Sequence, residues 1–403
     1  MNIFCRERIA FTGIISAILF SAVSLCQAID EVPIPVFPPN PVTCEILSET
    51  VICRQPGRYI AWPTITRAGN GDLLVAFSGD RDWHVCPWGR IYVVRSSDGG
   101  KTWSPPAIAA DTPLDDRDAG LLTLPNGNIM LTFITSLAFD DPKVERYKPY
   151  RDDAAAISVD EKKKWPGSWN RISKDHGKTW GPIHKSPANT PHGPTPLKDG
   201  RVLYVRPQVF ESADQGKTWT QLAEILRDPA TWKSRYAFLS EQHAAEAADG
   251  RIVALSRYAN KKGQPADIEL RQIASTDGGK TWTPPRKTGM MGYPAHVLRL
   301  ENGWLLAVYS RRIPPMGQRA CLSKDNGQTW LVEEEMVLSN AAPQDAGDLG
   351  YPSSAQLPDG SIWTVFYQVD EPHGKFPVLM GVHWRLNALT PTAALPASQD
   401  PQL

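Results

Sequence analysis

The sequence has no excess of charge of either sign and no long apolar run beyond its first 30 residues. It contains 43 Lys and Arg residues against 43 Asp and Glu residues, so its formal net charge at pH 7 is zero. A chain without net positive charge lacks the electrostatic attraction that favours binding to nucleic acids and anionic membrane surfaces. After residue 28, no apolar run reaches the roughly 20 residues that span a bilayer. These observations argue against a nucleic-acid-binding protein and against a membrane span.

Cysteines are few, and their spacing does not match a metal site. The chain has six, of which Cys44, Cys53, Cys86 and Cys321 lie beyond residue 28, and none belongs to a CxxC pair. Zinc sites usually place two cysteines close together in this way. No metal and no cofactor are therefore expected. Cys44 and Cys53 flank the hairpin-like segment CEILSETVIC, which predicts one disulfide between them and leaves two buried thiols.

The first residues have the pattern of a secretory signal peptide. A positive head with Arg6 and Arg8 precedes an apolar run from Ile9 to Leu25, and small residues follow up to Ala28. This order predicts a signal peptide over residues 1–28 that is cleaved after Ala28. The mature protein is expected to be soluble and either periplasmic or secreted.

What the sequence has in abundance is turn residues and tryptophan, with 36 Pro, 30 Gly and 14 Trp. One turn motif, S-x-D-x-G-x-T-W, recurs five times, starting at Ser96, Ser173, Ser212, Ser275 and Ser323. Its Asp can accept hydrogen bonds from turn N–H groups, and its Gly can adopt positive φ. We expect these boxes to lock tight turns, with the Trp packed beneath each of them.

A second repeat predicts the architecture. Six hairpin-like segments carry turn glycines at Gly71, Gly127, Gly200, Gly250, Gly303 and Gly360. Repeats of about 50 residues that contain four strands each are typical of β-propellers. The prediction is an all-β, six-bladed propeller of four-stranded antiparallel blades over residues 29–390, with a disordered tail over 391–403. The segment before Gly57 is expected to complete the sixth blade and close the ring.

Polar and aromatic residues occupy the starts of the six innermost strands, where a structural core would have Val, Ile or Leu. These segments are Tyr59–Trp62, Asp116–Asp118, His192–Pro194, Glu241–His243, Tyr293–His296 and Tyr351–Ser353. The first connecting loop adds Asp80, Arg81, Asp82 and His84. Because innermost strands converge on the propeller axis, these residues are expected to share one pocket. A Tyr beside a Glu can act as a nucleophile, and Arg suits a substrate carboxylate.

The five boxes resemble the Asp-boxes, or BNR repeats, of the bacterial sialidase superfamily, and the resemblance covers nearly all of the mature chain. It implies that Tyr351 is a nucleophile paired with Glu241, and that Asp82 or His84 is the acid/base. For substrate binding, Arg257 resembles the second arginine of the family and Arg319 or Arg312 the third, with Asp118 at a pocket position. The pocket residues Arg81, His192 and His243 complete the predicted substrate-binding set.

One departure from the family concerns its first arginine, which is replaced here by Ala61 in the segment YIAWP. The favoured interpretation is an exo-glycosidase that removes a terminal, possibly sialic, acidic sugar from glycans with retention of configuration. The alternatives are a glycosidase for another sugar such as rhamnose, a lyase on a uronate polysaccharide, and a non-catalytic carbohydrate-binding propeller. The expected partner is a glycan or polysaccharide, and a monomer is expected.

Overall fold

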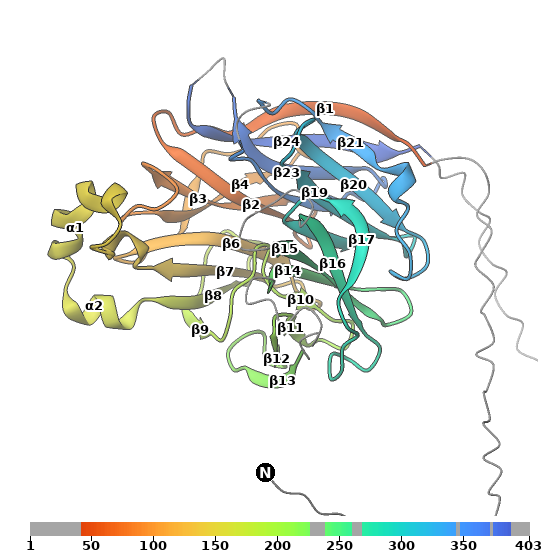
Figure 1. The fold of residues 1–403 in the computed structure, drawn as a ribbon, viewed down its shortest axis with the longest axis horizontal. Helices are drawn as coiled ribbons and strands as arrows, with labels where there is room; N and C mark the ends of the chain where they lie inside the picture. The colour runs from red at the N-terminus through yellow and green to blue at the C-terminus, as the bar shows by residue number, and fades with distance from the viewer. Residues whose placement is uncertain (1–41, 226–237, 260–267, 344–346, 371–373, 388–403) are drawn as a thin grey trace, which may run out of the picture. The chain divides into compact units, whose positions relative to one another are not determined.

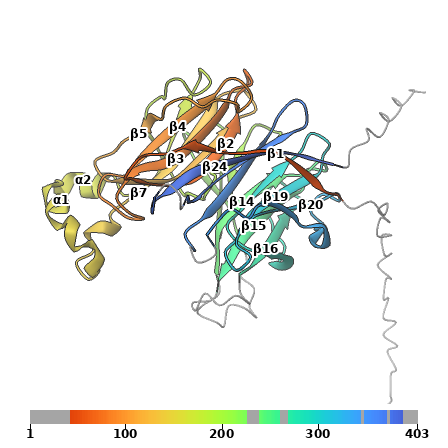
Figure 2. The ribbon, with the colours of Figure 1, turned by 90° about the horizontal axis from the view of Figure 1, so that it is seen from above.

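Short strands separated by turns are the main secondary structure of the described residues. The computed structural model describes residues 42–225, 238–259, 268–343, 347–370 and 374–387. In these residues the strands form six four-stranded antiparallel sheets, which are the blades of a six-bladed β-propeller, as predicted (Figures 1 and 2). The predicted signal peptide (1–28) and the tail (391–403) lie outside the described residues.

Each of the first five blades consists of four consecutive strands. Blades one to three are β2 (Tyr59–Arg67), β3 (Leu73–Arg81), β4 (Arg90–Ser96) and β5 (Ala107–Ala110); β6 (Asp115–Thr123), β7 (Ile129–Ser136), β8 (Gly167–Ser173) and β9 (His184–Ser186); and β10 (Thr195–Pro196), β11 (Val202–Tyr204), β12 (Gln208–Ser212) and β13 (Thr220–Glu224). Blades four and five are β14 (Phe238–Glu246), β15 (Ile252–Ala259), β16 (Glu269–Ser275) and β17 (Arg286–Met291), then β18 (Ala295–Arg299), β19 (Leu305–Arg311), β20 (Gly317–Ser323) and β21 (Met336–Ser339).

The sixth blade joins the two ends of the described chain. Its inner strands are β22 (Gly350–Gln356), β23 (Ile362–Val369) and β24 (Pro377–Leu386), and its outermost strand is β1 (Cys44–Cys53), which pairs antiparallel with β24. The predicted closure by the segment before Gly57 is therefore confirmed. Because this segment is one continuous strand and not a hairpin, Cys44 and Cys53 lie at its opposite ends and both are free. The disulfide prediction is wrong.

Helical structure interrupts the second blade between β7 and β8. This insertion contains the 3-10 helices η1 (Ala138–Asp140) and η2 (Glu145–Tyr150) and the helices α1 (Arg151–Ala156) and α2 (Val159–Lys164), seen at the left of Figure 1. It has a small apolar core of its own, which includes Phe139 and Val85. Since Val85 follows the loop with Asp82 and His84, the insertion supports that loop. A further 3-10 helix, η4 (Val332–Glu334), precedes β21.

The five boxes lock the turns between the third and fourth strands of blades one to five. In every box the Ser hydroxyl, the Thr N–H and the Thr hydroxyl donate to the Asp carboxylate. The second Gly of the first box, Gly100, has φ 92°, and a Cβ there would collide with the Trp363 ring of blade six. All five box tryptophans are at least partly buried. The boxes are thus structural, as predicted.

We expect Asp214→Ala to lower the unfolding free energy by about 1–2 kcal/mol, because Asp214 accepts three hydrogen bonds from Ser212 and Thr218, as a helix N-cap does. Thermal unfolding should show a lower midpoint for Asp214→Ala than for Lys217→Ala, a change at the exposed neighbouring position of the same box. Equal midpoints would contradict a turn-locking role for the carboxylate.

Candidate active site

The innermost strands have an unusual backbone conformation at their polar starts. Four residues in β2, β6, β14 and β22, namely Trp62, Asp118, Glu241 and Tyr351, have φ between 48° and 57°. In each strand the pairing register breaks at that residue. Left-handed backbone costs a non-glycine residue on the order of 1–3 kcal/mol and is found mainly at functional sites. The repeated break in strand pairing therefore indicates that the starts of these four strands form a candidate functional site.

Tyr351 and Glu241 are in direct contact, although 110 residues separate them in sequence. The Tyr351 hydroxyl donates to Glu241 Oε1 at 2.5 Å, and Arg257 Nη1 donates to Glu241 Oε2 at 3.0 Å. Burial, followed by the negative charges of Glu241 and Asp118, raises the pKa of Tyr351 well above its ordinary value. Tyr351 is therefore a neutral hydrogen-bond donor at rest, with a carboxylate placed to take its proton.

Arg312 lies beside this pair, and part of its guanidinium group makes no hydrogen bond to the described residues. Its Cζ is 5.7 Å from the centroid of the Tyr351 ring and 5.2 Å from that of the Tyr293 ring. Its Nε and Nη2 atoms are buried and have no hydrogen-bond partner among the described residues. Gly350 makes this approach possible, since a Cβ there would collide with Ser310 and contact Arg312. Two adjacent free donors form a fork that suits a carboxylate.

Arg319, the alternative to Arg312 in the sequence, has a different environment. It is 2% exposed, and its guanidinium group donates to the carbonyls of Gln318, Ser339 and Pro315. These contacts hold the edge of blade five together and leave Arg319 unsuited to substrate binding. Of the two candidates, only Arg312 reaches the Tyr351 site.

Arg81 also has a structural position and not the substrate-binding one that the sequence suggested. It is fully buried, pairs with Asp115 at 2.6 Å, and donates to the carbonyls of Trp83 and His84. It therefore fixes the backbone of the loop that carries Asp82 and His84, and its buried guanidinium group is turned toward that loop and Asp115.

The two acid/base candidates of that loop differ in charge environment. Asp82 forms an ion pair with Arg58. The His84 ring lies 4.9 Å from that of Trp62, and desolvation followed by the charge of Arg117 lowers its pKa to about 4. His84 is consequently neutral at pH 7.

Asp118 differs from His84 in the direction of its pKa shift. Burial raises its pKa, with a further contribution from the charge of Glu241. Its carboxyl group lies 3.6 Å from Arg117 Nε and is 21% exposed on the side chain. A carboxyl group with a raised pKa can act as a general acid.

The sequence did not identify several groups around the site. Arg117 lies 4.4 Å over the ring of Trp62, which is 2% exposed and fills the space beside Ala61. Asp348 accepts hydrogen bonds from Tyr59 and Tyr367, both at 2.8 Å. Asp348 lies in an irregular segment before β22, so no strand or turn pattern in the sequence points to it. Arg117 lies within the segment Asp116–Asp118 that the sequence placed in the pocket, but no role was predicted for it.

Three histidines at or beside the innermost strands form a cluster near Tyr351. His192 and His243 are 2% and 8% exposed, and the His192 ring centroid is 6.3 Å from that of Tyr351. With His296 they form a buried cluster in which all ring pairs are within 5.7 Å. No hydrogen bond joins His192 or His243 to Tyr351 or Glu241 among the described residues, so their predicted role in binding substrate stays a prediction.

Burial of these three histidines predicts an acid-sensitive fold. Desolvation lowers the pKa of His243 to about 3 and those of His192 and His296 well below their ordinary value. Below pH 6.5 the three histidines bind protons in the unfolded chain but not in the folded chain. Their contribution to the free energy of unfolding is therefore complete above pH 6.5 and is lost as the pH falls. Below pH 6.5, each histidine lowers the free energy of unfolding by about 1.4 kcal/mol per pH unit, and the three together lower it by about 4 kcal/mol per pH unit. The free energy of unfolding, measured with urea at pH 6 and pH 5, should depend on pH less steeply in His243→Gln. The difference should be about a third of the slope that the three histidines contribute, and an unchanged slope would contradict this prediction.

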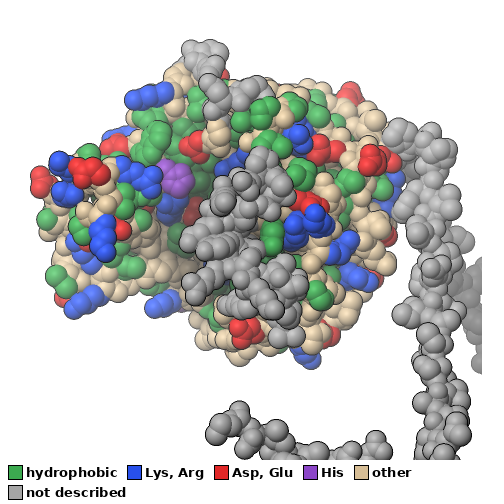
Figure 3. Space-filling model, viewed as in Figure 1, with side chains coloured by type: hydrophobic (Ala, Val, Ile, Leu, Met, Phe, Trp, Pro, Cys, Tyr) green, Lys and Arg blue, Asp and Glu red, His purple; other side chains and the backbone are tan. Residues whose placement is uncertain are grey.

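The described residues contain neither a metal-binding nor a membrane-spanning arrangement. No group of three or more His, Cys, Asp or Glu side chains among them is placed to hold a metal ion. No helix in the same residues is long and apolar enough to cross a membrane. On the face in Figure 3, acidic and basic side chains are interspersed, in keeping with the zero net charge.

Comparison of the structure with solved structures gives the same fold. A protein of unknown function from Dyadobacter fermentans is 26% identical, with a TM-score of 0.70 over 85% of this chain and 99% of that chain. A sialidase from Streptococcus pneumoniae is 14% identical, with a TM-score of 0.57 over 86% and 70%. An α-L-arabinanase from Penicillium chrysogenum is 14% identical, with a TM-score of 0.53 over 84% and 98%. The last two similarities show the fold alone.

Comparison with curated proteins gave no match. The family model described as a BNR repeat-like domain matches residues 154–364, which are more than half of the 403 residues. That match agrees with the five boxes and with the sialidase-like propeller. The chain therefore belongs to the family of proteins with a BNR repeat-like domain.

Proposed function

We propose that this protein is an exo-acting glycosidase that removes a terminal acidic sugar from a glycan, with retention of configuration. The observation that carries the proposal is the 2.5 Å hydrogen bond from Tyr351 to Glu241, beside the free donors of Arg312. The strained backbone at both residues supports it, since neither strain nor a buried Tyr–Glu pair is needed to build a propeller blade.

The geometry suits a two-step displacement. In the first step the Tyr351 oxygen attacks the anomeric carbon as Glu241 takes the phenolic proton, and the bond to the leaving oxygen breaks as an acid protonates it. In the second step water attacks the anomeric carbon and gives a proton to the same acid/base group, the bond from that carbon to the Tyr351 oxygen breaks, and Glu241 returns its proton to Tyr351. Arg257, paired with the other Glu241 oxygen, keeps that carboxylate oriented.

A tyrosine nucleophile is reasonable when the substrate is itself an anion. A carboxylate on the sugar close to the anomeric carbon would repel an Asp or Glu nucleophile, whereas a neutral phenol avoids this repulsion. Arg312 is placed to bind such a carboxylate. Among Asp82, His84 and Asp118, the raised pKa favours Asp118 as the proton donor. We therefore assign the acid/base step to Asp118, with Asp82 and His84 as the alternatives that the sequence suggested.

One observation favours a second candidate, a lyase acting on uronate polysaccharides. With Ala61 in place of an arginine, Arg312 can still neutralise one uronate. His84, neutral at pH 7, has a basic nitrogen that can remove the proton next to the carboxylate. The Tyr351 phenol would then protonate the leaving oxygen.

A substrate screen separates these functions. Purified protein is incubated with chromogenic sialosides, uronides and rhamnosides and with uronate oligosaccharides, and products are followed by chromophore release and by absorbance near 235 nm. The proposal predicts release of an intact acidic sugar. An unsaturated, ultraviolet-absorbing product would establish the lyase, release of a neutral sugar alone would indicate another glycosidase, and binding without turnover would indicate a carbohydrate-binding propeller.

A further inference from the structure

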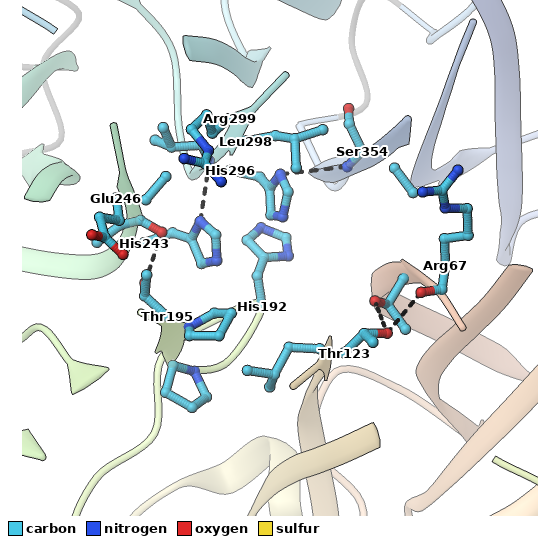
Figure 4. A pocket seen from close by; sticks show the side chains of 18 of the residues that line it. Arg67, Thr123, His192, Thr195, His243, Glu246, His296, Leu298, Arg299 and Ser354 are labelled. Atoms are coloured by element: carbon cyan, nitrogen blue, oxygen red, sulfur yellow. Dashed lines mark hydrogen bonds between the residues drawn. The ribbon is translucent and has the colours of Figure 1, made fainter. Parts of the chain in front are cut away.

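A second cavity lies on the propeller axis, at the opposite end of the innermost strands from Tyr351 and Glu241. It is lined by the later residues of all six innermost strands, for example Arg67 of β2, Thr195 of β10 and Ser354 of β22, and has a volume of about 510 Å³. We call it the axial cavity (Figure 4). Its size is within the range of small-molecule sites, and the candidate catalytic pair is not among its lining residues.

The inner end of the axial cavity is formed by His192, His243 and His296. The rings of His243 and His296 are stacked, with centroids 4.3 Å apart and an interplanar angle of 17°, and the His192 ring is nearly perpendicular to both. Figure 4 shows the three rings gathered together, with hydrogen bonds leading outward from His243 and His296.

The hydrogen bonds of these rings define which nitrogen carries a proton. The N–H of Val297 donates to His243 Nδ1 at 3.1 Å, and the N–H of Ser354 donates to His296 Nδ1 at 3.4 Å. Both Nδ1 atoms are thus acceptors, so the neutral rings carry their proton on Nε2. Burial keeps both rings neutral, because it lowers their pKa values well below 7. Neither Nε2 has a hydrogen-bond partner among the described residues, which leaves two neighbouring donors.

His192 offers the complementary group. The Thr64 hydroxyl donates to the carbonyl of Ala119 at 2.8 Å, so at its 3.1 Å contact with His192 Nδ1 it must accept the proton of that ring. The remaining nitrogen, Nε2, is an acceptor that is buried without a partner among the described residues. Two donors and one acceptor in one cluster match the hydroxyl groups of a sugar, each of which donates and accepts.

Two basic side chains at the mouth of the axial cavity, Lys198 and Arg299, have no ion-pair partner among the described residues. Arg67 lies 3.7 Å from Glu301, and Lys198 Nζ donates to the carbonyls of Ala247 and Ala248. Arg299 is exposed, and its guanidinium group has neither an ion pair nor a hydrogen bond among the described residues; Figure 4 shows Arg299 among the residues that line the cavity. A ligand that satisfies both the histidine cluster and Arg299 carries hydroxyl groups and an anionic group.

We propose that the axial cavity is a second binding site, for a monosaccharide-sized sugar acid. The sugar hydroxyls bind the histidine cluster and the carboxylate faces Arg299. This inference is independent of the reaction proposed at Tyr351, since the two sites share no binding group.

The test is a calorimetric titration of the Arg312→Gln protein, in which the Tyr351 site is weakened, with D-glucuronate, N-acetylneuraminate and D-glucose. We expect at least one of the two sugar acids to bind with one-to-one stoichiometry and glucose to bind at least about tenfold more weakly. Adding His243→Asn, whose amide oxygen can still accept from Val297 but which lacks the Nε2 donor, should weaken binding about tenfold or more. Adding His243→Gln, which restores a donor near that point, should recover most of the affinity.

Arg299→Gln provides a variant at an exposed position where folding is not at risk. In the same background it should weaken sugar-acid binding several-fold and leave glucose unchanged. The proposal is overturned if neither sugar acid binds, if glucose binds equally well, or if His243→Asn and Arg299→Gln leave the affinity unchanged while thermal unfolding shows folded protein. Because the readout is binding, failure of the glycosidase proposal would leave this result unaffected, and the reverse also holds.

Discussion

Tyr351→Phe should lower kcat/KM on the substrate found in the screen by at least about 1,000-fold and leave the fold intact. The phenolic oxygen is the atom proposed to attack the anomeric carbon, and its loss also removes the 2.5 Å hydrogen bond to Glu241. Loss of a group that takes part in bond formation typically costs several orders of magnitude in rate. Only one hydroxyl is removed, so the midpoint of thermal unfolding should change by a few degrees at most. Steady-state kinetics and thermal unfolding measure the two quantities.

The matched control is Tyr204→Phe. Tyr204 is also a buried tyrosine, packed against Trp219 in blade three at 4.9 Å, and its hydroxyl has no hydrogen-bond partner among the described residues. The same chemical change there should leave kcat/KM within about twofold. If Tyr351→Phe retained most of the activity, the phenol would not be the nucleophile, and a mechanism through His84 would fit better.

Arg312→Gln should lower kcat/KM on an acidic substrate by about 30- to 5,000-fold. This range corresponds to the 2–5 kcal/mol that loss of a buried charge partner costs in binding. The effect should be largest for substrates with a carboxylate and small for a neutral analogue, because the unpaired Nε and Nη2 atoms serve only the anion. Kinetics on a matched acidic and neutral pair of glycosides measures this selectivity.

Arg385→Gln is the control for general charge effects, since Arg385 pairs with Glu45 in the outer strands of blade six. It should leave both substrates unaffected. Equal losses on the acidic and the neutral substrate in Arg312→Gln would show that Arg312 supports the site structurally, for example through its contact with the Tyr351 ring, and does not recognise a carboxylate.

The fold was predictable because its signals are local and repeated. Each box contains all the hydrogen-bonding partners of its own turn, so S-x-D-x-G-x-T-W specifies the turn without help from distant residues. The Cys44–Cys53 prediction failed for the opposite reason. Whether CEILSETVIC bends into a hairpin or extends depends on β24, more than 320 residues away, which pairs with its whole length.

The site was predictable to the level of its strands but not of its side chains. Polar residues at the starts of innermost strands predicted that Tyr351 and Glu241 lie together, and the family resemblance added Arg257 of β15; the structure places all three in contact. Which side chains turn toward the Tyr351 site depends on bulges and on neighbouring blades. Arg319 is turned into blade five by carbonyls near Pro315, and Arg81 is captured by Asp115. A sequence pattern with a two-residue period cannot distinguish these environments from that of Arg312.

The most direct test of the proposed mechanism is the configuration of the first product. The substrate found in the screen is mixed with enzyme in an NMR tube, and the anomeric signals are followed before the free sugar equilibrates. A Tyr351 nucleophile requires two displacements at the anomeric carbon, so the first sugar released should have the configuration of the substrate. An inverted first product would show that water attacks directly and would contradict the central role of the Tyr351–Glu241 pair.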